Sequence, residues 1–572
     1  MHAPKVDYEQ NYGTLFSPLW AYTLAAYVPD TWDIEIYDCI VFDKEDISYS
    51  PLFAFSGINQ DFDSIIRTRD HLKAKYPDSV FIIGGPITWS FEQEGKLYLF
   101  NEFDHIFVLD GEETLPAFLS KFEHRGFSDD DTAEKIIRAQ RFELRNSKSI
   151  HMDLMRKNVS NYYGAVIEVS RGCPFLCEFC DIRVLPGNNR ANNKKVSLII
   201  DELNAYYELG IHQYQFACDN FIGDIVWARE CVDAILDWVE TKNASISIFT
   251  WLTINLYKLP ELMQKMRRAR FSILFIGIES VNQNSLLETA KVQNSTELSE
   301  AVMTIESFGF VIAPGFIFGF DSDTEDVFDD TLDFMRNTGI IGGDPSFLTA
   351  LPGTPLHQRM KQTGRLVEDA SPTARKKITT NIRYLLDSNF LIDGFIKFVR
   401  NYTGAEFQLD RFRNHLNAMK TNENYIPLEG AGYGSPKEYT KMQFGNRKNR
   451  SMLIARLSYI ITRPSVFVAV VRGWLMFKTM SRQMPGLSIH FNYWIYVWTN
   501  IAIKYDQIRK SDFMLYSVSE NFDFEKLLAL GQTPASIVKG ARVKGDVKEA
   551  LQQRYTNRAL EHIVEKRLKL KT

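Results

Sequence analysis

Three cysteines, Cys173, Cys177 and Cys180, stand in one short stretch of the sequence. An apolar run from Ala165 to Val169 precedes them and is typical of a strand, and the glycine and proline on either side of the first cysteine predict a loop. Soft thiolates at this spacing can hold three corners of a [4Fe–4S] cluster, because the loop can curl around it. The fourth iron then lacks a protein ligand, and an open metal position generally indicates chemistry rather than a structural role.

A zinc site and chance clustering among the six cysteines of the chain are the alternatives. Zinc in a structural site normally takes four ligands, and no His or Cys stands at finger-like spacing beside the loop. The sequence therefore favours the iron–sulfur cluster, with the three cysteines as its ligands.

The composition is that of a globular protein. The chain has 572 residues, which predicts two or three domains, and its 13% of aromatic residues favours large apolar pockets. The cysteines show no disulfide pattern and the first residues show no signal-peptide pattern, so we expect a cytoplasmic protein. The sequence shows no nucleic-acid-binding module and no Walker-type nucleotide loop.

The net charge of −5 hides an asymmetry. From Lys441 to the end, 23 Lys and Arg stand against 9 Asp and Glu, whereas residues 1–440 carry 43 against 62. A basic carboxyl-terminal part usually indicates a solvated face, but it also suits an anionic membrane surface or an anionic substrate.

The first part of the chain, residues 15–123, is predicted to be an α/β unit. We expect a helix at Leu19–Tyr27 and strands at Ile34–Tyr37, Leu52–Phe55, Val80–Ile83 and His105–Leu109, the last three suited to a buried parallel sheet. Ligands of open parallel sheets bind at strand ends, where glycine lets the backbone approach them. The small or acidic residues after the last three strands are Ser56, Gly57, Gly84, Gly85, Pro86, Asp110, Gly111 and Glu112.

Residues 126–160 are predicted to form a linker. Beyond it strands and helices alternate as far as residue 370, the pattern of a (βα) barrel or part of one. The predicted strands are Ala165–Val169, Gln213–Ala217, Ser245–Leu252, Ile273–Gly277, Val311–Phe318 and Pro345–Leu351, and helices between them include Ser197–Leu209 and Ile225–Glu240. Functional residues of such a barrel should follow the carboxyl ends of its strands.

The CxxxCxxC loop, with Phe179 just before its last cysteine, resembles that of the radical S-adenosylmethionine (SAM) enzymes. The resemblance implies a partial (βα)6 barrel in which the open iron binds the amino and carboxylate groups of SAM. An electron from the cluster would then cleave SAM and leave a 5′-deoxyadenosyl radical that abstracts hydrogen. The zinc and electron-carrier alternatives predict no such cleavage.

Several strand ends resemble the same family. By this resemblance Asp219 faces the methionine ammonium of SAM, Glu279 lies near the ribose, and the Gly315 segment packs against adenine. Cys218 is interpreted as a packed thiol rather than a fourth ligand. The residues that the resemblance places around SAM are Phe179, Asp219, Asn220, Glu279, Ser280, Gly315, Ile317 and Leu351.

One branch of the family is closer still. The segments 177–182, 219–223, 319–323 and 351–356 resemble cobalamin-binding radical SAM proteins related to hopanoid C-2 methylases, over residues 15–370. The resemblance implies that residues 1–125 form a Rossmann-like cobalamin-binding domain, and that the eight strand-end residues named above hold the nucleotide tail of the cobalamin. It implies cobalamin-dependent methylation of an unactivated carbon in a lipid or another hydrophobic metabolite, with a low-potential electron donor such as flavodoxin or ferredoxin.

The sequence departs from cobalamin proteins in two ways. Residues 38–43 lack the Asp-x-His-x-x-Gly element whose histidine binds cobalt, which argues only against histidine ligation. The apolar first strand of the domain is also missing, so either the start lies upstream or the sheet is one strand short. A radical reaction without methyl transfer, such as ring contraction, cyclisation or carbon–carbon coupling, is therefore the second hypothesis, and a non-catalytic iron–sulfur or zinc module is a third.

Residues 371–572 match no pattern of the family and are predicted to be mainly helical. We expect helix over Ile382–Met419, a loop at Asn422–Asn449 and a helical stretch at Ile454–Met480 that is interrupted by Pro464 and too charged for a membrane span. The dense aromatic run Phe491–Trp498 follows. Either these helices cover the open side of the barrel, or their basic and aromatic residues contact a membrane, which would place the protein at the periphery of the inner membrane.

Overall fold

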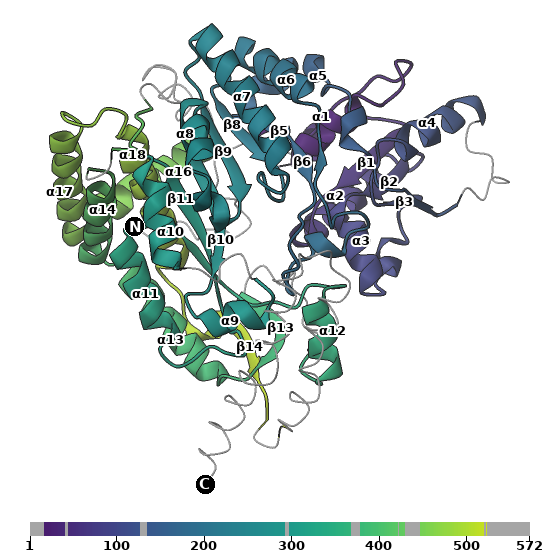
Figure 1. The fold of residues 1–572 in the computed structure, drawn as a ribbon. Helices are drawn as coiled ribbons and strands as arrows, with labels where there is room; N and C mark the ends of the chain where they lie inside the picture. Colours follow the sequence, from purple (N-terminus) through teal and green to yellow (C-terminus); the bar gives the residue numbers. More distant parts are fainter. Residues whose placement is uncertain are drawn as a thin grey trace. The chain divides into compact units, whose positions relative to one another are not determined.

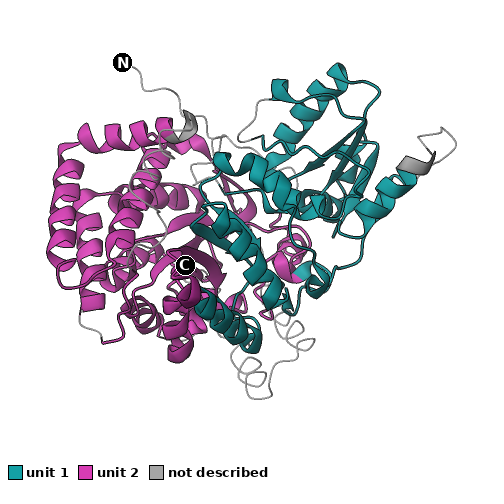
Figure 2. Cartoon of the chain, turned by 90° about the horizontal axis from the view of Figure 1, so that it is seen from above, with its two compact units in different colours: residues 1–173, 184–238, 372–375 teal, residues 174–183, 239–371, 376–572 magenta. Residues whose placement is uncertain are grey.

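The computed structural model describes residues 16–39, 44–125, 134–291, 297–367, 378–420, 423–428, 447–519 and 522. The chain divides into two compact units (Figure 2). Unit 1 comprises residues 1–173, 184–238 and 372–375, and unit 2 comprises residues 174–183, 239–371 and 376–572. The domain boundaries at residues 125, 160 and 370 stay predictions.

The first sheet of unit 1 has four parallel strands in the order β1 (Leu52–Ser56), β2 (Val80–Gly84), β3 (His105–Val108) and β4 (Ile136–Arg138). The helices α2 (Phe62–Lys75), α3 (Pro86–Gln93) and α4 (Thr114–Arg125) alternate with these strands. The apolar runs of β2 and β3 are buried along their length, as expected for strands covered on both faces. The three predicted strands after residue 50 are therefore confirmed, and β4 lies within the predicted linker.

The strand predicted at Ile34–Tyr37 is wrong, whereas the preceding helix is confirmed as α1 (Leu19–Ala25). Residues 33–38 have no regular secondary structure. In open α/β sheets with the strand order 2-1-3-4-5, the second strand along the chain pairs only with the first. Among the described residues no strand precedes Leu52, so they contain no first strand with which Ile34–Tyr37 could pair. The segment at Ile34 therefore has no partner with which to form a ladder.

Unit 1 also contains the elements around the first cysteine. β5 (Ala165–Glu168) pairs in parallel with β8 (Gln213–Ala217), and the short strands β6 (Ser170–Arg171) and β7 (Asn192–Asn193) pair antiparallel. The helices are α5 (Met152–Asn158), which lies in the predicted linker, α6 (Val196–Glu208) and α7 (Ile225–Lys242), whose last residues belong to unit 2.

Unit 2 contains the parallel strands β9 (Ser247–Leu252), β10 (Phe271–Glu279), β11 (Val311–Phe318) and β12 (Asp344–Phe347), adjacent in this order. They alternate with α8 (Pro260–Arg268), α9 (Gln283–Glu288), α10 (Leu298–Ser307) and α11 (Val327–Thr338), and α12 (Pro355–Gln362) follows (Figure 1). All six predicted barrel strands are thus strands, although β12 ends at Phe347 rather than Leu351.

The carboxyl-terminal part of unit 2 is mainly helical, as predicted. Its helices are α13 (Ser388–Tyr402), α14 (Ala405–Lys420), α16 (Arg447–Ile461), α17 (Pro464–Met480) and α18 (Ser488–Tyr505). Helix was wrongly predicted from Ile382, because Ile378–Tyr384 is strand β13, which pairs in parallel with β14 (Phe513–Ser517). β-Branched residues at its start favour the strand, and Asp387 caps α13 by accepting a hydrogen bond from the Phe390 N–H at 2.9 Å. Most of the loop predicted at Asn422–Asn449 lies outside the described residues.

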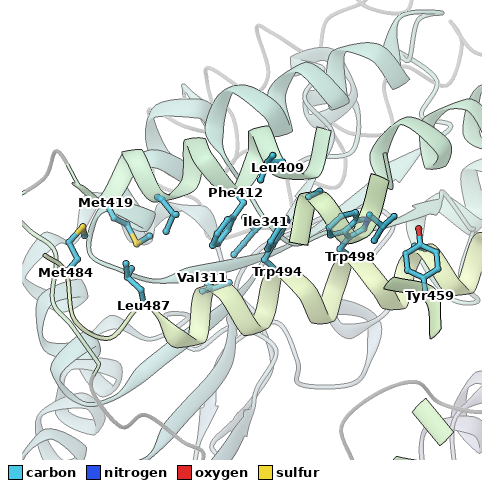
Figure 3. Packing of buried hydrophobic residues seen from close by; sticks show 14 residues of the cluster. Val311, Ile341, Leu409, Phe412, Met419, Tyr459, Met484, Leu487, Trp494 and Trp498 are labelled. Carbon is cyan, nitrogen blue, oxygen red and sulfur yellow. The ribbon is translucent and has the colours of Figure 1, made fainter. Parts of the chain in front are cut away.

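The aromatic run of α18 forms the core of these helices. Trp494 stacks on Phe412 of α14 with ring centroids 4.4 Å apart, and its indole N–H donates to Gln408 (Figure 3). Trp498 lies beside it and donates to the Thr403 carbonyl. The run is therefore core, and it is α16 and α17 that carry exposed apolar residues.

Candidate functional site

Glu178, between two of the cysteines, is held on all sides within unit 2. Its backbone N–H donates to the Thr289 carbonyl at 2.8 Å, and its carbonyl accepts from the Leu356 N–H at 3.1 Å. Its carboxylate accepts two hydrogen bonds from Arg359 of α12, at 2.8 and 2.9 Å. Because Glu178 is almost fully buried, these contacts fix the half of the loop that carries Cys177 and Cys180.

Arg359 also joins the loop to the end of β11. Its third nitrogen donates to Asp321 at 2.5 Å, and the fully buried Arg365 donates to both oxygens of Asp321 at 2.6 and 2.8 Å. Burial opposes the charge of Asp321, but the guanidinium groups of Arg365 and Arg359 hold its pKa well below the usual range. Sequence analysis did not single out Asp321, because its partners Arg359 and Arg365 follow 38 and 44 residues later and no local pattern marks such a pair.

A second buried carboxyl group lies against the same turn. Glu288 of α9 accepts from the N–H groups of Asp321 and Ser322 at 2.9 and 2.8 Å. Burial and then the nearby Asp321 carboxylate raise the pKa of Glu288. Burial also raises the pKa of Asp323 to about 6. These two groups therefore bind a proton more tightly in the folded chain than in the unfolded chain.

We expect the free energy of unfolding to fall as the pH rises above about 5, the region where unfolded carboxyl groups have lost their protons. The folded chain then binds more protons than the unfolded chain, and each such group contributes a slope of up to about 1.4 kcal/mol per pH unit. Urea unfolding at several pH values should show that Glu288→Gln reduces this slope and stabilises the chain above neutral pH. A slope unchanged by Glu288→Gln would contradict the raised pKa.

Two cations face the cysteines of unit 2. Lys291 carries charge interactions with Cys177 and Cys180, and Arg183 does so as well while donating to the Leu176 carbonyl at 2.5 Å. Burial lowers the pKa of Arg183 and the two thiols oppose this, whereas Glu279 and Cys177 outweigh the burial of Lys291 and raise its pKa. Sequence analysis predicted neither cation. Arg183 closely follows the cysteine loop in sequence and Lys291 follows the strand that ends at Glu279, so both could have been sought there.

Glu279 and Gly315, predicted on separate strands, come together in unit 2. Gly277 and Gly315 are register partners, and a Cβ at Gly277 would lie 2.2 Å from a Glu279 oxygen. Glu279 follows a bulge with φ of 64°, and its carboxylate pairs with Lys291 at 2.5 Å. The left-handed backbone turns this carboxylate along the half-buried face of the sheet, which Ile317 shares with Gly315.

Phe179 lies on the same side of the loop as these residues. Its ring is 6.2 Å from that of Phe320, and the Lys291 ammonium lies 5.6 Å from its centroid. Ser280 and Leu351 serve the local backbone: Ser280 Oγ accepts from the Asn282 N–H, and the Leu351 carbonyl accepts from Thr354 at the start of α12. Their contacts with SAM stay predictions.

The first cysteine is fixed within unit 1. The Cys173 N–H donates to the Asn188 carbonyl at 2.9 Å, and Asn220 Nδ2 lies 3.9 Å from its sulfur. Asp219 accepts from the Gly172 N–H at 2.5 Å. Gly172 has φ of 93° and a Cβ there would lie 2.2 Å from the Arg190 carbonyl oxygen, so only glycine fits this entry to the loop.

The side-chain oxygen of Asn220 is available to accept a hydrogen bond from a ligand. Its side chain is buried, and Asn220 Oδ1 has no hydrogen-bond partner among the described residues. A buried acceptor without a donor is costly, and a ligand ammonium would satisfy it. The contacts of Asp219 with the ammonium of SAM and of Asn220 with SAM stay predictions.

The predicted cobalamin loops lie at one edge of the first sheet, since their strands are adjacent and parallel. A Cβ at Gly85 would lie 2.2 Å from Ser56 Oγ, so the first two loops touch. Pro86 begins α3, and the Ile87 N–H donates to the Gly57 carbonyl at 3.2 Å. Glycines at three neighbouring strand ends fit a ligand laid across this edge.

The two acidic residues among the predicted cobalamin contacts, Asp110 and Glu112, pair with an arginine of unit 1. Arg171, two residues before the first cysteine, pairs with Asp110 at 3.2 Å, Glu112 at 2.6 Å and Glu168 at 2.8 Å. These ion pairs therefore link the loop after β3 to the residues just before Cys173, all within unit 1. Sequence reasoning missed Arg171, and it missed Arg141, whose Nη2 has no hydrogen-bond partner among the described residues.

The donor set fits a thiolate-ligated cluster. None of the three cysteines forms a disulfide, and cations face the two in unit 2. Cys173 belongs to unit 1, and within the ranges that the structure describes no group of three His, Cys, Asp or Glu residues is gathered as a metal site. Ligation by Cys173, Cys177 and Cys180 therefore rests on residue type, spacing and electrostatics.

The cysteine loop lies in a segment that matches a known protein-family model. Residues 167–335 match the model of the radical SAM superfamily. This segment of the chain is a radical SAM domain. The match contains the cysteine loop, Asp219, Glu279 and Gly315, and it confirms the family and the class of enzyme that the sequence predicted, with a [4Fe–4S] cluster and SAM as the cofactors of that class. A second model, a domain of unknown function (DUF4070), matches residues 354–444, which include Arg359 and Arg365.

Two curated relatives of this radical SAM protein are methyltransferases by name. An uncharacterized methyltransferase, sll1242, of Synechocystis sp. is 31% identical over 362 residues, which cover 62% of this chain and 65% of the relative. The hopanoid C-2 methylase of Rhodopseudomonas palustris is 29% identical over 359 residues, which cover 60% of this chain and 64% of the relative. The chain thus spans slightly less than two thirds of the length of either relative.

A solved structure shares the fold of this radical SAM protein. It is that of the cobalamin-dependent SAM radical enzyme OxsB with aqua-cobalamin bound, with a TM-score of 0.50 and 15% identity over 90% of this chain and 75% of that chain. The likeness confirms the predicted fold class, an α/β protein with parallel sheets and a mainly helical carboxyl-terminal region.

Proposed function

We propose that this protein is a cobalamin-dependent radical SAM enzyme that methylates an unactivated carbon of a hydrophobic metabolite or lipid. The observation that carries the proposal is the arrangement around the cysteine loop, where Cys177 and Cys180 face Arg183 and Lys291, and Lys291 pairs with Glu279. The names of the two curated relatives support methyl transfer, and that of the hopanoid methylase supports a lipid substrate.

When bound, the cluster and SAM supply the radical chemistry and cobalamin supplies the methyl group, with a flavodoxin- or ferredoxin-like donor providing electrons. The cations Arg183 and Lys291 stabilise the negative charge of the thiolates. Glu279 would accept hydrogen bonds from ribose hydroxyls, and the missing side chains at Gly277 and Gly315 leave room for the Glu279 carboxylate on this face of the sheet. Asp219 and Asn220 Oδ1 accept hydrogen bonds from the ammonium of SAM.

A radical reaction without methyl transfer is the second candidate, and the first sheet favours it. Its strand order, β1-β2-β3-β4, contains no reversal, so the described residues lack the switch point at which open α/β sheets usually bind ligands. Asp110 and Glu112 are also engaged by Arg171 rather than directed to a ligand.

Anaerobic turnover distinguishes the two. The full chain is reconstituted with iron and sulfide, supplied with cobalamin, SAM and a low-potential reductant, and assayed for 5′-deoxyadenosine and S-adenosylhomocysteine. Both products together with protein-bound cobalamin in the visible spectrum support methylation. Deoxyadenosine without S-adenosylhomocysteine supports the second candidate, and the absence of both products with every hydrophobic substrate tried contradicts both.

A further inference from the structure

Exposed apolar side chains are concentrated on two helices of unit 2. Among the described residues, 17 large apolar side chains are exposed, and eight of them lie between Ile454 and Leu475. Single exposed apolar residues are normal on a protein surface, whereas a contiguous set marks an interaction site. The eight are Ile454, Leu457, Ile461, Phe467, Val468, Val471, Trp474 and Leu475, and we call them the outer apolar face.

Their spacing places them on one side of each helix. On α17 they recur at intervals of three and four residues from Phe467 to Leu475, and on α16 they occur at 454, 457 and 461. The opposite side of α17 is already committed to the core, where Val466, Ala469 and Gly473 are buried. A Cβ at Gly473 would lie 2.5 Å from the Trp494 ring, so the helix is pressed against α18 and the outer side is left to another partner.

Basic residues predominate in the sequence around this face, although three of them pair with acidic residues elsewhere in unit 2. Between Tyr439 and Tyr505 the sequence has ten Lys and Arg and no Asp or Glu. Lys478 and Arg482 are exposed at the end of α17, and the Lys478 ammonium lies 5.6 Å from the centre of the Trp474 ring. Arg472 pairs with Glu406 of the neighbouring α14, which Figure 1 shows beside α17. Basic residues beside exposed Trp, Phe and Leu form the pattern of a helix that lies in an anionic membrane interface.

The geometry favours lying on the membrane over crossing it. No single helix in the described part of the chain is long and apolar enough to span a bilayer, and the consecutive helices 450–461 and 464–480, which pass that test together, are bent by 100°. A helix of 17 residues is about 26 Å long, shorter than the hydrocarbon core of about 30 Å. Pro464 at the bend and the charges of Arg472 and Lys478 fit the interface rather than the interior.

We propose that the outer apolar face of α16 and α17 binds the surface of an anionic lipid bilayer. The contact is independent of methylation, since it needs no cofactor, and it would give a radical SAM enzyme access to substrates dissolved in the membrane. The bound helices lie parallel to the surface, with the apolar side chains below the headgroups and Lys478 and Arg482 at the phosphates.

Vesicle flotation of the full-length, cluster-reconstituted protein tests this. Vesicles of phosphatidylglycerol and phosphatidylcholine are compared with vesicles of phosphatidylcholine alone, at low and high salt. The triple variant Phe467→Gln/Val471→Gln/Leu475→Gln should bind anionic vesicles about tenfold more weakly or worse, because three apolar side chains no longer leave water. Lys478→Gln/Arg482→Gln should weaken binding to anionic vesicles and reduce its dependence on salt. The matched control, Leu99→Gln/Val226→Gln/Met303→Gln, changes exposed apolar residues elsewhere and should bind as the parent does.

Any one of four results would overturn the proposal. The parent protein does not float with anionic vesicles, or the apolar variant floats equally well. Alternatively, the parent is a dimer in solution, the apolar variant is a monomer and neither floats, which would make the face a subunit interface. Finally, the apolar variant melts several degrees below the control without any change in flotation, which would show that the chain itself covers the face.

Discussion

Replacing Cys177 by alanine is expected to abolish cluster binding and to lower the yield of 5′-deoxyadenosine by at least about 10³-fold. Cleavage of SAM needs an electron from the cluster, and in our proposal Cys177 is one of only three protein ligands of that cluster. The fold should survive, because Glu178 is held through its backbone and through Arg359 whether or not the neighbouring thiol is present. Iron content, the visible spectrum and the melting temperature of the anaerobic protein measure these effects.

Cys218→Ala is the matched control for this experiment. Cys218 also follows a strand of the radical SAM domain, but its thiol contacts the Phe216 carbonyl at 3.8 Å. We expect this variant to retain the iron and the activity of the parent. Iron content that is unchanged in Cys177→Ala, or lost in Cys218→Ala, would show that the ligand set is wrong.

The sequence predicts the elements of the site well because each depends on local patterns. Apolar runs of β-branched and aromatic residues locate β8 and β11 at their observed bounds, and the cysteine spacing locates the cluster loop. Gly315 and Glu279, which the resemblance singles out, lie close together in the structure, and their contacts with SAM stay predictions. The segment at Ile34 shows the limit of such reasoning, since a strand needs a pairing partner that its own sequence does not contain.

The charged partners of the site could not be predicted in the same way. Arg359 binds Glu178 from a helix 181 residues away in sequence, and Arg171 binds Asp110 and Glu112 across 61 and 59 residues. No periodicity marks such pairs, because an ion pair is a property of the tertiary fold. Lys291 was the exception that could have been sought, since a lysine twelve residues after Glu279 lies within reach of the same strand end.

Arg359→Met is expected to destabilise the folded chain by about 3 to 5 kcal/mol, the cost of breaking a buried ion pair by removing one partner. The change leaves Glu178 without its two strongest hydrogen bonds and removes one of the two cations of Asp321, although both carboxylates stay buried. Urea unfolding measures this loss. The segment that matches the domain of unknown function begins at residue 354. Its first helix, α12, would then hold the cysteine loop in place through Arg359.

Arg336→Met provides the matched control, because Arg336 pairs with Asp333 on the surface of α11, where both side chains are largely exposed. Exposed pairs contribute about 1 kcal/mol or less. If the two variants lost similar stability, burial would not be the reason for the effect. A double variant with Glu178→Gln gives a second check, because it removes the carboxylate that Arg359→Met leaves buried without its cation, and it should be less destabilised than Arg359→Met alone.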